Sequence, residues 1–123
     1  MILFHVTTLA HFESQKGNDC YESPTFEEEK FIHLSTNLQV EGVLNRYYSS
    51  ERQLILFLID SEKLGSALVS KALVGDELFP HLYSPLSFKT VLEIRTIIRT
   101  NENWDVTLKS VIWSPNLFNS HET

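Results

Sequence analysis

Hydrophobic and polar residues alternate in three parts of the chain, which is the pattern of a β-strand with two different faces. These segments are residues 2–8 (ILFHVTT), 31–36 (FIHLST) and 90–99 (TVLEIRTIIR), the last with one solvent-exposed face. Residues 53–60 (QLILFLID) form a continuous apolar run instead, which predicts a central strand covered on both faces. A further strand is predicted over residues 67–74 (ALVSKALV).

Two segments have the spacing and end signals of short helices. Residues 8–16 place Thr8 at a helix start and are followed by Gly17, a residue suited to a helix end. The second helix is expected directly after the strand at 31–36, because Thr36 and Gln39 have the spacing of a capping box. Its apolar stripe consists of Val40, Val43, Leu44, Tyr47 and Tyr48.

Three segments lack a clear period. Residues 18–30 (NDCYESPTFEEEK) predict an exposed acidic loop, which is either a solvated connector or a cover over a binding site. Residues 75–86 (GDELFPHLYSPL) contain two prolines, which argue against a central strand and favour an ordered loop or an edge segment. Residues 101–123 fit either a strand or one face of a helix, and we favour an added strand with a frayed end. The whole pattern predicts one α+β domain with two short helices.

The composition of the chain limits which classes of partner it can bind and in which compartment it is expected. The 123 residues carry a formal charge of −6, and the basic residues are scattered, which argues against nucleic-acid binding. No stretch approaches the ~20 apolar residues of a membrane span. Cys20 is the single cysteine, so no disulfide forms within the chain, which favours a reducing compartment. We therefore expect a cytoplasmic protein, and its composition is compatible with a small anionic ligand held by a few local donors; its oligomeric state stays open.

Three histidines, His5, His33 and His81, lie among large apolar residues in or near strands. His5 shares a strand face with Thr7, and His33 shares one with Ser35. Each histidine taken singly fits a buried ring whose nitrogens are satisfied by the backbone. Three in similar settings favour a shared pocket, with His81 facing the same cleft as the other two.

Ser35 and Thr36 end a strand and begin the second predicted helix, where free N–H groups suit a phosphate, carboxylate or carbonyl. Capping the helix explains these residues equally well. Glu77 is a candidate carboxylate for general base catalysis or for stabilising an oxocarbenium ion, and a polar turn explains it equally well. A three-histidine metal site is a further alternative, although short ligand spacings such as H-x-H are absent.

Several motifs together resemble the bacterial domain-of-unknown-function family 952. The resemblance rests on FHVTT, FIHLSTNLQVEGVLNRYY, LILFLIDSEKL and ELFPHLYSPL, and it covers residues 2 to about 99. We therefore expect a family 952 domain over residues 1–100 and a C-terminal extension of the same domain over 101–123. The family usually has glycine where this chain has Lys30 and Ser84. It also often has an acidic residue in the strand that here reads VSKALV.

The resemblance implies an ADP-ribosyltransferase-like split sheet with a cleft that holds NAD in the enzymes of that fold. By motif position, His5 would contact the nucleotide, and His33, Ser35 and Thr36 would lie near the nicotinamide. Glu77, His81 and Tyr83 are candidates for the third polar position. The implied function is a nucleotide or ADP-ribose-type pocket, either in a transferase or glycohydrolase or in a binding or interaction module without catalysis. NAD or an ADP-ribose-like compound is the expected ligand, and no cofactor is required.

Overall fold

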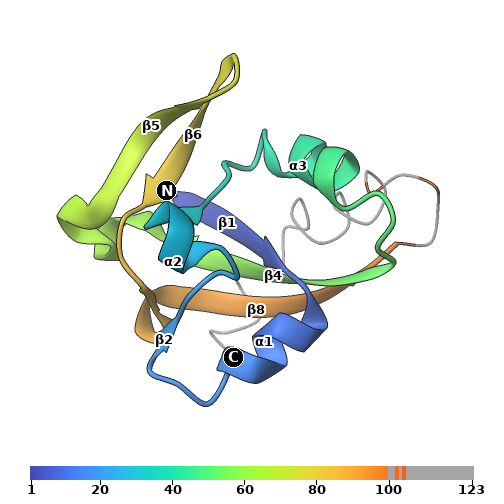
Figure 1. Cartoon of the computed structure of the whole chain (residues 1–123), viewed down its shortest axis with the longest axis horizontal. Coiled ribbons are helices and arrows are strands. Elements are labelled where there is room, and N and C mark those ends of the chain that lie inside the picture. The colour runs from blue at the N-terminus through green and yellow to red at the C-terminus, as the bar shows by residue number, and fades with distance from the viewer. Residues whose placement is uncertain (100–101, 103, 105–123) are drawn as a thin grey trace.

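The structure, a computed structural model, describes residues 1–99, 102 and 104 and has mixed α+β architecture (Figure 1). The α-helices are α1 (Leu9–Gln15), α2 (Phe26–Glu29) and α3 (Val40–Tyr47). The strands are β1 (Ile2–Thr7), β2 (Cys20–Tyr21), β3 (Ile32–His33), β4 (Gln53–Asp60), β5 (Leu68–Val74), β6 (Glu77–Leu82), β7 (Leu86–Ser87) and β8 (Val91–Ile98). The predicted α+β class is confirmed, and the described residues contain a third α-helix that we did not expect. The predicted strand and frayed end at residues 101–123 lie outside the described residues, except for residues 102 and 104.

The strands form three antiparallel sheets with the orders β1-β4-β8, β3-β6-β5 and β2-β7. A short backbone contact links the two larger sheets: Phe4 of β1 and Ser35 exchange two backbone hydrogen bonds of 2.8 Å. Leu34, the residue before Ser35, donates its N–H to the carbonyl of Pro80 in β6 at 3.0 Å.

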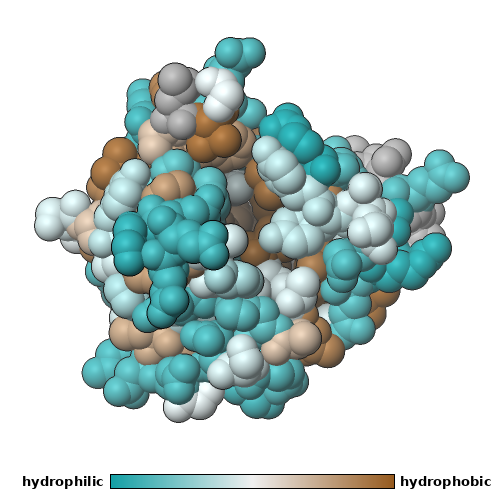
Figure 2. All heavy atoms as spheres, viewed as in Figure 1, coloured by the Kyte–Doolittle hydropathy of each residue, from teal (hydrophilic) through white to brown (hydrophobic). Residues whose placement is uncertain are grey.

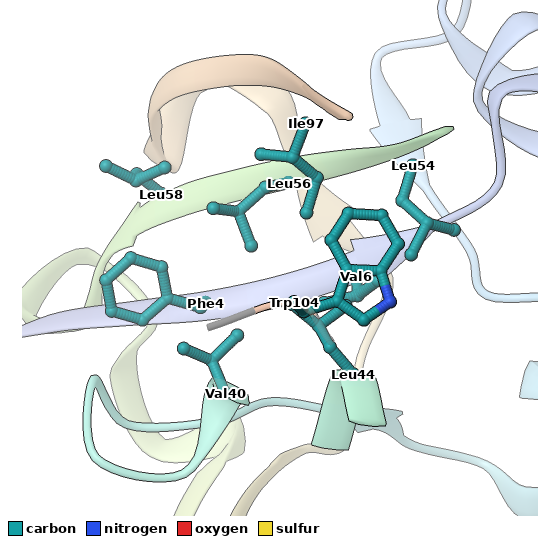
Figure 3. Packing of buried hydrophobic residues seen from close by; sticks show 9 residues of the cluster. All are labelled: Phe4, Val6, Val40, Leu44, Leu54, Leu56, Leu58, Ile97 and Trp104. Carbon is teal, nitrogen blue, oxygen red and sulfur yellow. The ribbon is translucent and has the colours of Figure 1, made fainter. Parts of the chain in front are cut away.

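Strand β4 lies between β1 and β8, as its continuous apolar run predicted. Alternate residues of β4 enter two different cores. Leu54, Leu56 and Leu58 pack with α3 (Figure 3), whereas Ile55, Phe57 and Ile59 pack on the opposite face with residues of β2, β3 and β6. Each fully buried side chain of this kind stabilises the fold by about 1.5–3 kcal/mol.

Trp104 is fully buried in the core beneath α3 (Figure 3). Its backbone N–H donates to Asn45 Oδ1 at 3.0 Å, and its indole Nε1–H donates to the carbonyl of Tyr48 at 3.1 Å. Both partners belong to α3 or to the residue that follows it. Trp104 therefore fixes the C-terminal half of α3 against the sheet.

The predicted loop at residues 18–30 was wrong in part, because it contains β2 and α2. Tyr21 is fully buried, and its ring packs edge-on against Phe57, with the two ring centroids 5.0 Å apart. Helix α2 ends at Lys30, which has a left-handed backbone with φ of 67°. A glycine adopts this conformation without strain, and a lysine does not.

The prediction for residues 75–86 was also wrong, because β6 is the central strand of its sheet despite Pro80. The β5–β6 pairing explains why proline is tolerated there. Val69 pairs with His81 and Ala72 pairs with Phe79, so two residues of β5 face Pro80 alone. This bulge removes the ladder bond that the missing N–H of proline would have made.

Helix α3 begins at Val40, later than the capping pattern predicted. Half of the expected capping box is present: the side chain of Gln39 accepts a hydrogen bond from the N–H of Thr36 at 3.1 Å. The same side chain donates through Nε2 to the carbonyl of Leu78 at 2.7 Å and to Glu77 Oε2 at 3.2 Å. Gln39 thus joins the turn before α3 to the β5–β6 hairpin.

Candidate functional site

A pocket of about 450 Å³ lies where β1 and residues 33–35 separate. Figure 2 shows it as a hollow near the centre of the view, between α2 and α3, with hydrophobic residues at its base. Five parts of the chain surround it. The lining residues are His5, Val6, Thr7, Thr8, Ser23, Pro24, Thr25, His33, Leu34, Ser35, Val43, Tyr47, Tyr48, Val74 and Phe79.

His5 spans the gap between the two sheets at the base of this pocket. Its Nδ1 is 2.7 Å from the carbonyl oxygen of His33, and its Nε2 is 2.8 Å from the hydroxyl of Tyr21. A carbonyl only accepts hydrogen bonds, so Nδ1 carries the proton. Nε2 of the neutral ring is then an acceptor, and Tyr21 donates to it. The ring of His5 thus replaces the backbone bond that a closed sheet would have made to His33.

Burial keeps this network neutral. His5 is only 6% exposed, and the loss of hydration lowers the pKa of its imidazole to about 4, although the bond to the His33 carbonyl acts in the opposite direction. Burial also raises the pKa of the Tyr21 hydroxyl, an effect that a hydrogen bond with Thr7 partly offsets. Thr7, Tyr21, His5 and the His33 carbonyl therefore form one buried, uncharged chain of hydrogen bonds.

The side chain of His33 lies at the pocket wall and is half exposed. Its Nε2 is 3.5 Å from Glu29 Oε2, and the other carboxylate oxygen of Glu29 accepts a hydrogen bond from the Thr25 hydroxyl at 2.5 Å. This bond from Thr25 is the main reason why the pKa of Glu29 is lowered, and the nearby His33 contributes. An imidazole held by a carboxylate beside a pocket can bind a polar group or transfer a proton.

His81 lies next to His33 but does not line the pocket. The two residues are paired across β3 and β6, with ring centroids 4.8 Å apart, and the ring of Phe31 stacks on His81 at 4.1 Å. His81 is 4% exposed, and neither ring nitrogen has a hydrogen-bond partner among the described residues. Burial, and secondarily His33, lowers the pKa of His81. The expectation that all three histidine rings face one pocket is therefore corrected for His81.

Four of the eight residues singled out from the sequence line the pocket: His5, Thr7, His33 and Ser35. The other four, Thr36, Glu77, His81 and Tyr83, do not. Thr36 donates its backbone N–H to the side chain of Gln39 in the turn before α3, and Glu77 accepts a hydrogen bond from the same side chain. Tyr83 is 48% exposed and packs against Phe31, with the two ring centroids 5.2 Å apart.

Sequence reasoning missed Tyr21 and Glu29. Both lie in the segment that was predicted to be an exposed loop. The available signal for a short strand was the pair Cys20–Tyr21, which stands in an otherwise polar segment and contains an aromatic residue. For Glu29, the signal was its position four residues before His33, but that spacing brings side chains together reliably only within a helix. Here α2 ends between them.

The described residues contain no group of three or more histidine, cysteine, aspartate or glutamate side chains arranged to hold a metal ion. Both ring nitrogens of His5 are bonded within the protein, so neither is free to bind a metal ion. In the same part of the chain, no helix is long and apolar enough to cross a membrane.

Known structures share this fold. The crystal structure of Protein CC0527 from Caulobacter crescentus superimposes with a TM-score of 0.78 at 24% identity, covering 88% of this chain and 98% of that one. A double-mutant crystal structure of the same protein gives 0.77 at 23% identity, with the same coverage. Its solution NMR structure gives 0.73 at 25% identity and covers 83% of this chain and 89% of that one.

No curated protein sequence matches this chain significantly. The family model described as "Protein of unknown function (DUF952)" matches residues 6–94, which run from the end of β1 to the middle of β8 and include every pocket-lining residue but His5. The chain therefore belongs to this family of proteins of unknown function.

Proposed function

We propose that the pocket between the two sheets binds a small molecule that contains a nucleoside, of the ADP-ribose or NAD type. The observation that carries this proposal is the lining of the pocket. Hydroxyls of Thr7, Ser35 and Thr25 are suited to ribose hydroxyls, and the aromatic rings of Tyr47 and Phe79 are suited to a base or nicotinamide. The pocket volume of about 450 Å³ is within the range of small-molecule sites.

The arrangement of the sheets supports the proposal that the fold is ADP-ribosyltransferase-like. Sheets β1-β4-β8 and β3-β6-β5 are linked by the backbone pair Phe4–Ser35, and residues of both sheets line the pocket beside this link. A split sheet with a ligand in the split is what that fold would require. A shared fold does not by itself identify a ligand, so the ligand class is inferred from the side chains that line the pocket.

The test is ligand-induced stabilisation in a thermal melt. NAD, ADP-ribose or a nucleoside at ~100 times its dissociation constant should stabilise the fold by ~2.7 kcal/mol, a rise of several degrees in Tm. Val43→Phe fills the pocket from α3 and should abolish the rise, whereas Val69→Phe, at an exposed position outside the pocket, should leave it unchanged. If none of these compounds raises Tm, or if Val43→Phe has no effect on the rise, the proposal is wrong.

A catalytic role is a second candidate, and the contact between His33 and Glu29 favours it. His33 would act as the general acid or base of a reaction that cleaves the N-ribosyl bond of NAD, releases nicotinamide and joins the ADP-ribosyl group to water in a glycohydrolase or to another nucleophile in a transferase. We expect the protein to release nicotinamide from NAD, measured by chromatography, and His33→Ala to abolish the release while ligand-free Tm changes little. Binding of NAD without release would assign the pocket to a binding module.

A further inference from the structure

We propose that the base of the pocket recognises its ligand through a hydrogen-bond donor, and that in a compound of the NAD type this donor is the carboxamide NH2 of the nicotinamide ring. This inference rests on the proposed function, because it specifies which end of the ligand enters the pocket and which group that end must carry. The observation behind it is the direction of the buried hydrogen bonds that join Thr7, Tyr21, His5 and the carbonyl of His33.

The carbonyl of His33 fixes the direction of these bonds. A carbonyl oxygen only accepts, so Nδ1 of His5, 2.7 Å away, donates to it. Burial keeps the imidazole neutral, with a pKa of about 4, so Nε2 has no proton and accepts from the Tyr21 hydroxyl at 2.8 Å. Tyr21 has thereby used its only proton, and its oxygen can only accept. The hydrogen bond between Tyr21 and Thr7 therefore has Thr7 as its donor.

Thr7 is the member of this series that, with His5, lines the pocket from β1. It is only 3% exposed and lies on the same strand face as His5. A threonine hydroxyl has one proton and two lone pairs, and here the proton is committed to Tyr21. Thr7 therefore offers a ligand only an acceptor. A ligand group that can only accept would meet lone pairs, or would draw the proton of Thr7 away from a buried oxygen.

Ser23 supplies the complementary group. Its Oγ is buried in the pocket lining and has no hydrogen-bond partner among the residues that the structure describes. A serine hydroxyl can rotate to donate, and a buried one without a partner is unfavourable until a ligand satisfies it. A primary carboxamide has an NH2 group that donates and a carbonyl that accepts. It can therefore give a hydrogen to Thr7 and take one from Ser23.

The position of His33 favours the nicotinamide end of the ligand over the adenine end. Adenine also combines an amino group with ring nitrogens that accept. The nicotinamide end, however, is the one that carries the N-ribosyl bond, and His33 lines the wall of the same pocket. A carboxamide bound at Thr7 would therefore bring the bond that the candidate reaction breaks into the pocket of its candidate acid or base.

The experiment compares NAD with two analogues that differ only in the group on the pyridine ring, by titration calorimetry in the cold at pH 7.5. The acetylpyridine analogue has a methyl group in place of NH2, so it loses the donor and keeps the carbonyl and the charge. The nicotinic acid analogue has a carboxylate, which only accepts. We expect NAD to bind about tenfold or more tightly than either analogue, because a site built to accept from an N–H rejects a compound that lacks it.

Three variants separate the hydrogen bond from the effect of charge. Thr7→Val removes the acceptor and should abolish the advantage of NAD over the acetylpyridine analogue, whereas Thr7→Ser keeps the hydroxyl and should keep the advantage. Tyr21→Phe releases the proton of Thr7, which can then donate to a carboxylate. In this variant the nicotinic acid analogue should gain affinity relative to NAD, and the acetylpyridine analogue should not. Because the ligands are compared on the same variant, a loss of stability affects them equally.

Equal or tighter binding of the acetylpyridine analogue to the unaltered protein would overturn this inference and leave the proposed function intact. Binding of ADP-ribose without binding of NAD would do the same. If Tyr21→Phe leaves the nicotinic acid analogue as weak as before, the preference is set by charge and not by the buried hydrogen bonds, and the inference fails. Absence of binding by NAD, both analogues, ADP-ribose and adenosine would overturn the proposed function as well.

Discussion

Lowering the pH from 7.5 to 5 should destabilise the fold through His5. The folded state holds this imidazole at a pKa of about 4, against an ordinary value of 6.5, because burial disfavours the charged ring. Between pH 4 and pH 6.5 the unfolded chain binds a proton at His5 that the folded chain does not bind. The contribution of His5 to stability is therefore complete above pH 6.5 and is lost as the pH falls toward 4.

The magnitude follows from the two pKa values. They differ by about 2.5, and each pKa unit corresponds to about 1.36 kcal/mol, so the whole contribution is about 3 kcal/mol. About 2 kcal/mol of this is lost by pH 5. Burial lowers the pKa of His81 as well. His81 therefore also destabilises the fold as the pH falls, and its contribution must be separated from that of His5. The lowered pKa of Glu29 acts below pH 4.5, outside this range.

Urea unfolding of the unaltered protein and of His5→Gln, each at pH 7.5 and at pH 5, separates the two histidines. Glutamine keeps a donor for the His33 carbonyl and an acceptor for Tyr21, but it does not titrate. The variant retains the contribution of His81, so the difference between the two pH-induced losses should be about 2 kcal/mol, the share of His5. The same loss in both proteins would show that His5 is not neutral and desolvated in the fold, and the reasoning would fail.

Other substitutions test separate features of the fold by urea unfolding. Lys30→Gly should raise the free energy of unfolding by about 0.5–1 kcal/mol, because φ at this position is 67°. Gly75→Ala, at φ of 61°, should lower the free energy of unfolding by about 1 kcal/mol. If both variants are less stable than the unaltered protein, Lys30 is not strained. Tyr21→Phe should cost about 1–3 kcal/mol, since it leaves a buried ring nitrogen of His5 without a donor. Leu56→Ala should cost about 2–5 kcal/mol, because it opens a cavity in the fully buried central strand. Saturation with a bound nucleoside should slow cleavage of residues 18–30 by a glutamate-specific protease, and unchanged cleavage would show that this segment does not close on the ligand.

Elements whose local pattern agreed with their place in the fold were predictable from the sequence. Strands β1 and β4 have the predicted bounds to within a residue, and Thr8 accepts the expected capping bond from the N–H of His11. The common face of His5 and Thr7 followed from the period of a strand. In each of these cases the signal lies within a few consecutive residues.

The rest depended on contacts between distant segments. Pro80 is tolerated in a central strand only because β5 forms a bulge opposite it, and β5 is about ten residues away in sequence. Tyr21 is buried because Phe57 and His5 pack around it. The position of His81 outside the pocket depends on the stacking of Phe31 and could not be derived from the strand period.

The packing of Trp104 has a practical meaning for where this domain can be cut. The part of the chain that is recognisable as DUF952 ends at residue 94, and a shortened protein designed on that boundary would omit the indole. Its removal would open a cavity in the core beneath α3 and would take one hydrogen-bond donor from the carbonyl of Tyr48, which would keep its bond from the N–H of Glu51. Val43, Tyr47 and Tyr48 of the pocket wall belong to or adjoin that same helix. A boundary drawn from sequence similarity would thus delete part of the support of the binding site, although it would delete no residue that lines it.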